Sequence, residues 1–231
     1  MITSTKSVTA ERLAKLPPPH PKETGDYWRP LPHSDLLAAV TAEAQKRGWL
    51  PFGQTVHLSR NGLDMAASID MALPAISSEA APSIGITNSN SRTYKATLWA
   101  GVRLGHNCNR GGIPFTKISL GKHTSGLTEH LEEEVAEACH LCEQAFRKIL
   151  PTIEWLKNKP IMDAQRFLVA AGRAGIMPWS RIGLVDSALR KNDLTNAWDL
   201  LKTFASVAIQ NKVLSQLDWT YRFVLLVRGK E

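Results

Sequence analysis

The sequence has few cysteines and no long hydrophobic run. It has three cysteines (Cys108, Cys139 and Cys142), which is an odd number and too few for a disulfide scaffold. This low count favours a reducing compartment. No apolar stretch near the N-terminus has the length of a signal peptide, and none elsewhere is long enough to span a bilayer. These absences predict a cytoplasmic protein with no membrane partner.

Acidic residues are missing from one long segment. Between Ala80 and Thr128 there is no aspartate or glutamate, and acids return at once with Glu129. The basic residues of this acid-free segment are Arg92, Lys95, Arg103, Arg110, Lys117 and Lys122. Together with the formal net charge of +7, this distribution predicts an anionic partner, of which nucleic acid is the commonest.

The hydrophobic pattern predicts an α+β fold: a twisted antiparallel sheet, covered on one face by a long helix, with a helical C-terminal part. Asn61-Gly62 predicts a two-residue hairpin turn that places alternate residues of 63–71 inward. Alternation along 94–104 predicts a further strand. Three parts are expected: a proline-rich arm over 1–33, an α+β core over 34–156, and a helical part over 157–231 packed on the core.

The expected long helix begins at a capping Thr128 and carries an apolar stripe. Pro151 is expected to kink or restart it. The stripe consists of Leu127, Leu131, Val135, Cys139, Cys142, Phe146, Ile149 and Ile153. Cys139-x-x-Cys142 also has the spacing of a zinc or redox motif. Because both thiols fall on the stripe and no second pair follows, we expect buried core cysteines without metal.

One face of the 94–104 strand combines two cations with an aromatic ring. Lys95, Trp99 and Arg103 are four residues apart and share this face. Proteins that bind single strands use cations along the backbone and an aromatic ring on which a base stacks. Alternatively, Trp99 covers a second layer of the protein. Residues of neighbouring segments that could border the face are Arg92, Arg110, Lys122 and His123.

The segment "VRLGHNCNRGG", residues 102–112, raises the alternative of an enzyme. A catalytic centre would combine Cys108 with His106 or His123 as a base. However, no third group to orient the base lies nearby, and the spacing matches no closed metal site. We therefore expect a turn permitted by the paired glycines, with no catalytic residue, no metal and no cofactor.

Several motifs together resemble the phage/plasmid-like family of uncharacterised mobile-element proteins. "YWRPLPHSDLLAAV" is similar to the N-terminal signature of that family, and "SIGITNSNSRTYKATLWAGVRLGHNCNRGGI" to its central block. "GKHTSG" and "NAWDLLKTFASVA" are similar to the segments that follow. The resemblance implies a role in DNA metabolism or in blocking a host defence protein. The element order is also similar to that of single-strand annealing proteins of the Rad-fifty-two type, an analogy of topology alone.

The sequence departs from the family pattern where titratable groups are expected. Asn88, Ser89 and Cys108 remain, whereas Asn90, Ser91 and Asn109 replace the family's histidine and aspartates. Either this chain has lost an activity, or the motif is a structured turn. We expect the turn. The resulting hypothesis is a protein that binds nucleic acid, with single-stranded DNA favoured, in recombination, annealing or replication. A second copy of the chain is a further candidate partner, in a homo-oligomer. A host-protein partner is the alternative.

Overall fold

In the computed structural model the chain divides into two compact units. The first comprises Met1–Gly112 with Thr116–Phe146, and the second comprises Ile113–Phe115 with Arg147–Glu231. The structure describes residues 5–16, 28–59, 61–72, 80–104, 113–121, 123–161, 163–173, 175–176, 179–190, 196–208 and 223–228. The division falls inside a long helix, between Phe146 and Arg147.

The fold is α+β, as the hydrophobic pattern predicts. The elements, in chain order, are β1 (Thr5–Ser7), α1 (Ala10–Ala14), α2 (His33–Lys46), β2 (Leu50–Ser59), β3 (Asp64–Ala72), β4 (Ala80–Ser89), β5 (Ala96–Leu104), β6 (Ile113–Gly121), α3 (Ser125–Glu129), α4 (Leu131–Asn158), α5 (Ala164–Arg173), α6 (Trp179–Leu189) and α7 (Ala197–Ala208). Among the described residues, no helix is long and apolar enough to cross a membrane.

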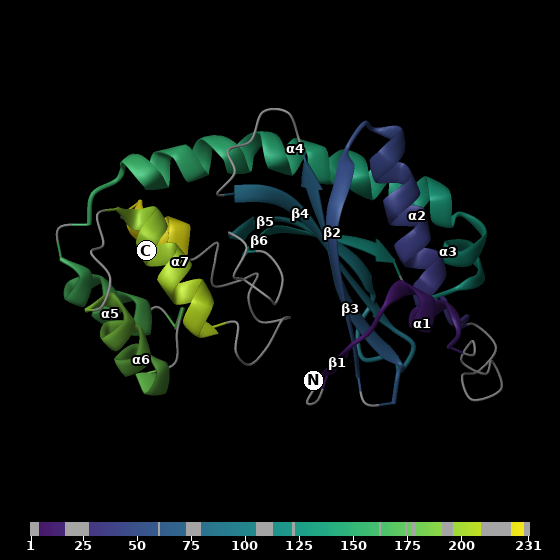
Figure 1. Ribbon diagram of the computed structural model, residues 1–231, viewed down its shortest axis with the longest axis horizontal. Coiled ribbons are helices and arrows are strands. Elements are labelled where there is room, and N and C mark those ends of the chain that lie inside the picture. Colours follow the sequence, from purple (N-terminus) through teal and green to yellow (C-terminus); the bar gives the residue numbers. More distant parts are fainter. Residues whose placement is uncertain are drawn as a thin grey trace. The chain divides into compact units, whose positions relative to one another are not determined.

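The strands form one sheet in the order of the chain, β1-β2-β3-β4-β5-β6 (Figure 1). The pairings from β1 to β5 are all antiparallel. The first strand and the short helix α1 both come from the proline-rich N-terminal arm, in which no regular helix is expected. Because β1 pairs with the end of β2, this part of the arm belongs to the sheet.

The hairpin between β2 and β3 is confirmed, but its turn is longer than predicted. The strands end at Ser59 and resume at Asp64. Gly62 has a positive φ of 72°, whereas Asn61 does not have a positive φ. Instead, the Asn61 side chain accepts hydrogen bonds from the Ser59 hydroxyl and the Leu63 backbone N–H. Asn61 thus stabilises the turn through its amide oxygen, as Asx residues commonly do.

Both faces of the central strands are buried, which corrects the expectation of a sheet covered on one face. The face expected to be covered carries aliphatic side chains such as Met65, Ile86 and Leu98, each 0% exposed. The opposite face carries the buried small polar residues Ser68, Ser83, Thr87, Ser89 and Thr97. Such residues show no strong hydrophobic signal, so their burial could not be recognised from the sequence.

The long helix begins at Leu131 rather than directly after Thr128, is preceded by a short helix, and is not restarted by its proline. A short helix, α3, begins at Ser125, and α4 follows after a break at His130. The Thr128 hydroxyl donates to the Thr124 carbonyl and does not cap a helix. Helix α4 continues through Pro151. The predicted stripe is buried except at Leu131, which is partly exposed.

Cys139 and Cys142 are buried and free, as predicted. Burial raises the pKa of the Cys139 thiol to about 12 and raises that of Cys142 further. Both thiols are therefore protonated near neutral pH. A protonated thiol is a poor nucleophile and a poor metal ligand, so these two cysteines behave as small core residues.

Arg47 joins α2 to the first part of α4, which run close together (Figure 1). Its guanidinium donates to Glu43 at 2.8 Å and to Glu143 at 3.3 Å. It also donates to the Ala136 carbonyl at 2.9 Å and lies 5.9 Å from the Trp49 ring centroid. A single half-buried side chain thus links the two helices through hydrogen bonds.

Replacing Arg47 with Met should lower the free energy of unfolding by about 2 kcal/mol, because charge-assisted hydrogen bonds to both helices are lost. The matched control is Lys46→Met. Lys46 is exposed and approaches Glu43 only to 3.8 Å, so its loss should cost less than about 0.5 kcal/mol. Urea unfolding measures both variants. Equal effects of the two substitutions would show that Arg47 does not join the helices.

The second unit contains its own aromatic core. Phe167, Phe204 and Phe223 contact one another with ring centroids 5.1 to 6.0 Å apart. Trp198 is also buried. The predicted helices of this unit are present as α5, α6 and α7, and residues 223–227 are helical as well.

Candidate functional site

Trp99 and Arg103 share one face of β5, as predicted, but the predicted binding residues are not all exposed to solvent. Lys95 precedes β5 and Arg103 lies near its end, so about eight residues, or roughly 27 Å of strand, separate them. Lys95 is exposed. Arg110 and Lys122 lie outside the described residues, as do His106 and Cys108 of the alternative catalytic centre.

Trp99 is part of the protein interior. Its side chain is 5% exposed, and it lies across Gly85, its register partner on β4. A Cβ at Gly85 would overlap the indole at Cε2, Cζ2 and Nε1. Of the two alternatives for Trp99, the structure supports the covering role, because a base cannot stack on a ring that is already buried against β4.

Arg103 is engaged in an ion pair. Its Nη1 donates to Oδ2 of Asp70 on β3 at 2.7 Å, and the Asp70 side chain is only 5% exposed. Burial raises the pKa of Asp70, while the Arg103 guanidinium lowers it. The segment around Arg103 lacks acidic residues, but the pairing of the strands places Asp70 of β3 beside Arg103. Arg103 is therefore not a free phosphate contact.

The turn between β4 and β5 is held by buried amide side chains. Asn90 accepts from the Leu31 N–H at 3.1 Å and donates to the Leu31 carbonyl at 3.0 Å. Asn88 donates to the same carbonyl at 2.8 Å and to Nδ1 of His33, also at 2.8 Å. These bonds fasten the start of α2 to the end of β4. Asn88 and Ser89 thus end β4, and Asn90 and Ser91 begin a structured turn, whereas the turn expected at "HNCNRGG" lies outside the described residues.

Hydroxyl groups hold the rest of the turn. Ser89 and Ser91 each donate to Oδ1 of Asp64 at 2.6 Å, and the Ser89 hydroxyl accepts from the Thr93 N–H at 3.0 Å. At its tip, Arg92 has a φ of 64°, the only positive φ of a non-glycine residue in the described part of the chain. The left-handed conformation is unfavourable for arginine, so the surrounding bonds must maintain it.

Arg92 contacts Trp28, which is distant in the sequence and in turn stacks on His123. Its guanidinium carbon lies 5.2 Å from the Trp28 ring centroid. The Trp28 ring also stacks on the His123 imidazole, with centroids 5.7 Å apart and planes inclined by 10°. The backbone joins the same segments, because Arg29 N–H donates to the His123 carbonyl at 3.0 Å. We call Trp28, Arg92 and His123 the Trp28 cluster.

Two buried histidines lie in this region, and both are neutral near pH 7. Burial lowers the pKa of His33, whose Nε2 donates to the Gly62 carbonyl while Nδ1 accepts from Asn88. Burial, with a smaller contribution from His33, lowers the pKa of His123 to about 4. Both ring nitrogens of His123 are buried without a hydrogen-bond partner. His123 therefore contributes a neutral aromatic surface to the cluster and no positive charge.

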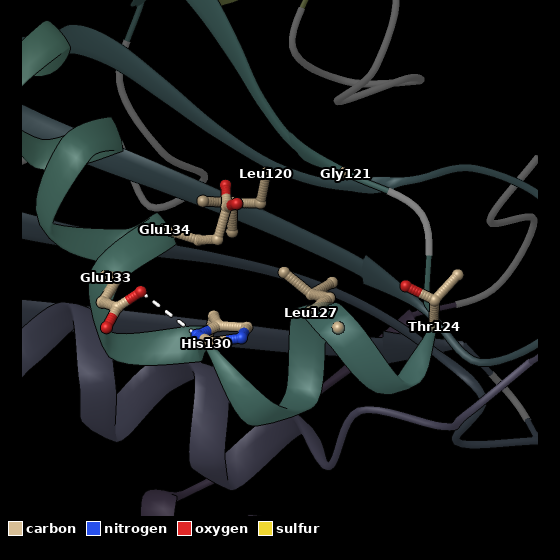
Figure 2. Close-up of a pocket in the computed structure, with 8 residues that line it drawn as sticks. Leu120, Gly121, Thr124, Leu127, His130, Glu133 and Glu134 are labelled. Atoms are coloured by element: carbon tan, nitrogen blue, oxygen red, sulfur yellow. Dashed lines mark hydrogen bonds and ion pairs between the residues drawn. The ribbon is translucent and has the colours of Figure 1, made fainter.

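A separate open pocket of about 450 Å³ lies between β6, α3 and α4 (Figure 2). Leu120 and Leu127 give it an apolar floor, while Glu133 and Glu134 line it with acid. His130 pairs with Glu133 at 3.1 Å, and Glu134 is exposed. These carboxylates would repel a phosphate, so the pocket does not extend a site for nucleic acid.

Sequence reasoning identified Arg92, Lys95 and His123 as candidates but missed Trp28. The only available signal was the "YWRPLP" motif, which shows no partner for the indole. Across the described residues, no three His, Cys, Asp or Glu side chains gather as metal ligands would. No family model, curated protein or solved structure matches the chain.

Proposed function

We propose that this protein binds nucleic acid, with single-stranded DNA as the favoured partner, in the recombination, annealing or replication of a mobile element. The binding surface would lie in the first unit, at the turn between β4 and β5 and along β6. Its cations would contact phosphates, and no catalytic step is required. The resemblance of the sequence to mobile-element proteins supports the biological setting.

The observation that carries the proposal is a set of exposed cations without acidic partners. Arg92, Lys95 and Lys117 are all exposed, and none makes an ion pair within the described part of the chain. Several other basic residues are engaged in ion pairs, namely Lys46, Arg47, Arg103, Lys157, Arg190 and Lys202, so the three cations are distinguished by lying together in the acid-free segment. A cation without an acidic partner can neutralise a phosphate, and the counterions that the nucleic acid then releases drive association.

A salt titration tests the proposal. We expect the logarithm of the association constant for a labelled oligothymidylate to fall linearly with the logarithm of the salt concentration. Lys95→Ala and Lys117→Ala should each flatten that slope by roughly one unit, because each removes one phosphate contact. Duplex DNA and RNA are titrated in parallel to establish which nucleic acid binds best.

The matched control is Lys148→Ala, which removes an exposed lysine of α4 outside the acid-free segment. This variant should leave the slope unchanged. If the folded protein bound no nucleic acid even at low salt, the proposal would be wrong, and a host protein with an acidic surface would become the favoured partner.

A further inference from the structure

We infer that the Trp28 cluster is the part of this surface that contacts bases. It would have the role that the sequence pattern predicts for Trp99. The inference rests on the proposed function and adds a second kind of contact to it. Phosphate contacts from lysines position a strand, whereas an aromatic or guanidinium plane stacks on its bases. The ligand class is an unpaired nucleotide within a single strand.

The first argument is the state of the Arg92 side chain. It is exposed, lies against the indole, and has no acidic partner among the described residues. Contact with the ring limits the freedom of a long side chain, so less entropy is lost when a ligand binds. The guanidinium has five N–H donors in one plane, and that plane can also stack on a base.

The second argument is the rigidity of the support. The turn that carries Arg92 is fixed through Asp64 and Leu31, and the Trp28 segment is fixed through the His123 carbonyl. Trp28 itself remains partly exposed, unlike the buried Trp99. A preorganised support that presents an exposed guanidinium plane is what stacking on an unpaired base requires.

The third argument is the position of Lys95. It lies three residues from Arg92, at the end of the same turn, and is exposed. A phosphate bound by Lys95 would bring the adjoining nucleotide near the Trp28 cluster. The acid-lined pocket of β6, α3 and α4 offers no comparable arrangement of cation and aromatic ring.

The test separates base contacts from phosphate contacts. Two ligands are compared: an oligothymidylate and an abasic deoxyribose-phosphate oligomer of the same length. Arg92→Lys keeps the charge but loses the plane, and Trp28→Leu removes the ring. Each should weaken binding to the oligothymidylate about tenfold, while the salt slope stays the same. Binding to the abasic oligomer should change less than about twofold.

Two substitutions in the second unit serve as matched controls. Arg173→Lys changes an exposed arginine, and Trp155→Leu removes the ring that Arg228 contacts at 5.3 Å. Neither should alter binding. If Arg92→Lys and the folded Trp28→Leu protein bound oligothymidylate as tightly as the unmodified chain, the inference would be wrong and the proposed function would stand. Equal losses on both ligands would overturn it as well. Failure of the unmodified chain to bind either ligand would instead refute the proposed function.

Discussion

Gly85→Ala should lower the free energy of unfolding by about 3 kcal/mol, because the new methyl group has no space. The Cβ would overlap the indole of Trp99, a rigid side chain that is itself 5% exposed. To remove this overlap, the Trp99 ring would have to leave its position over Gly85, which would expose apolar surface. Urea unfolding followed by circular dichroism measures the loss.

A double-mutant cycle tests the cause. Trp99→Ala alone should cost about 3–5 kcal/mol, as truncation of a buried tryptophan generally does. With the indole gone, Gly85→Ala should then cost less than about 1 kcal/mol, so the two effects are far from additive. Gly183→Ala is the matched control. Its Cβ meets nothing within 4 Å on helix α6, and it should stabilise the protein by up to about 1 kcal/mol.

The same cycle bears on function. If Trp99 swings outward to stack on bases, Gly85→Ala would be tolerated and would leave unfolding unchanged. That outcome would restore the base-stacking role of Trp99 and count against the Trp28 cluster. A large, non-additive loss of stability would confirm that Trp99 belongs to the interior of the sheet.

The sequence predicts those features of the fold that have a local pattern. The period-two alternation before Met71 and after Tyr94 predicts strands, and the helical stripe through Cys139 predicts the burial of α4. The second buried face escapes prediction because serine, threonine and glycine carry no hydrophobic signal. Pairing between distant strands decides their burial, as it decides that Asp70 meets Arg103.

Prediction of the candidate site fails for the same physical reason. The acid-free segment is visible in the sequence, and Arg92 and Lys95 are exposed within it. The ring beside Arg92, however, comes from Trp28 through a contact that no local pattern shows. Trp99, by contrast, has ideal spacing between two cations yet lies over a glycine of the next strand. The spacing of residues along one strand does not show which residues of the neighbouring strand they contact.

Acid should destabilise the protein through His123. Its pKa lies at about 4 in the folded chain, mainly because of burial, against an ordinary value of 6.5. The unfolded chain therefore binds more protons than the folded chain between these two values. Stability that is fully present above pH 6.5 is lost as the pH falls, by about 3 kcal/mol at pH 4 from this residue alone.

His123→Phe isolates this contribution, because phenylalanine keeps an aromatic ring against Trp28 and has no nitrogen to protonate. At pH 7 the variant should be at least as stable as the unmodified protein, since it removes two buried ring nitrogens that have no partner. The difference in unfolding free energy between the two proteins should then grow as the pH falls from 6.5 to 4. The carboxylates titrate in both proteins, so their effects cancel in that difference, which also includes the smaller interaction between His33 and His123. A difference that is independent of pH would show that His123 is not held neutral by its surroundings, and that the contact with Trp28 leaves the imidazole open to solvent.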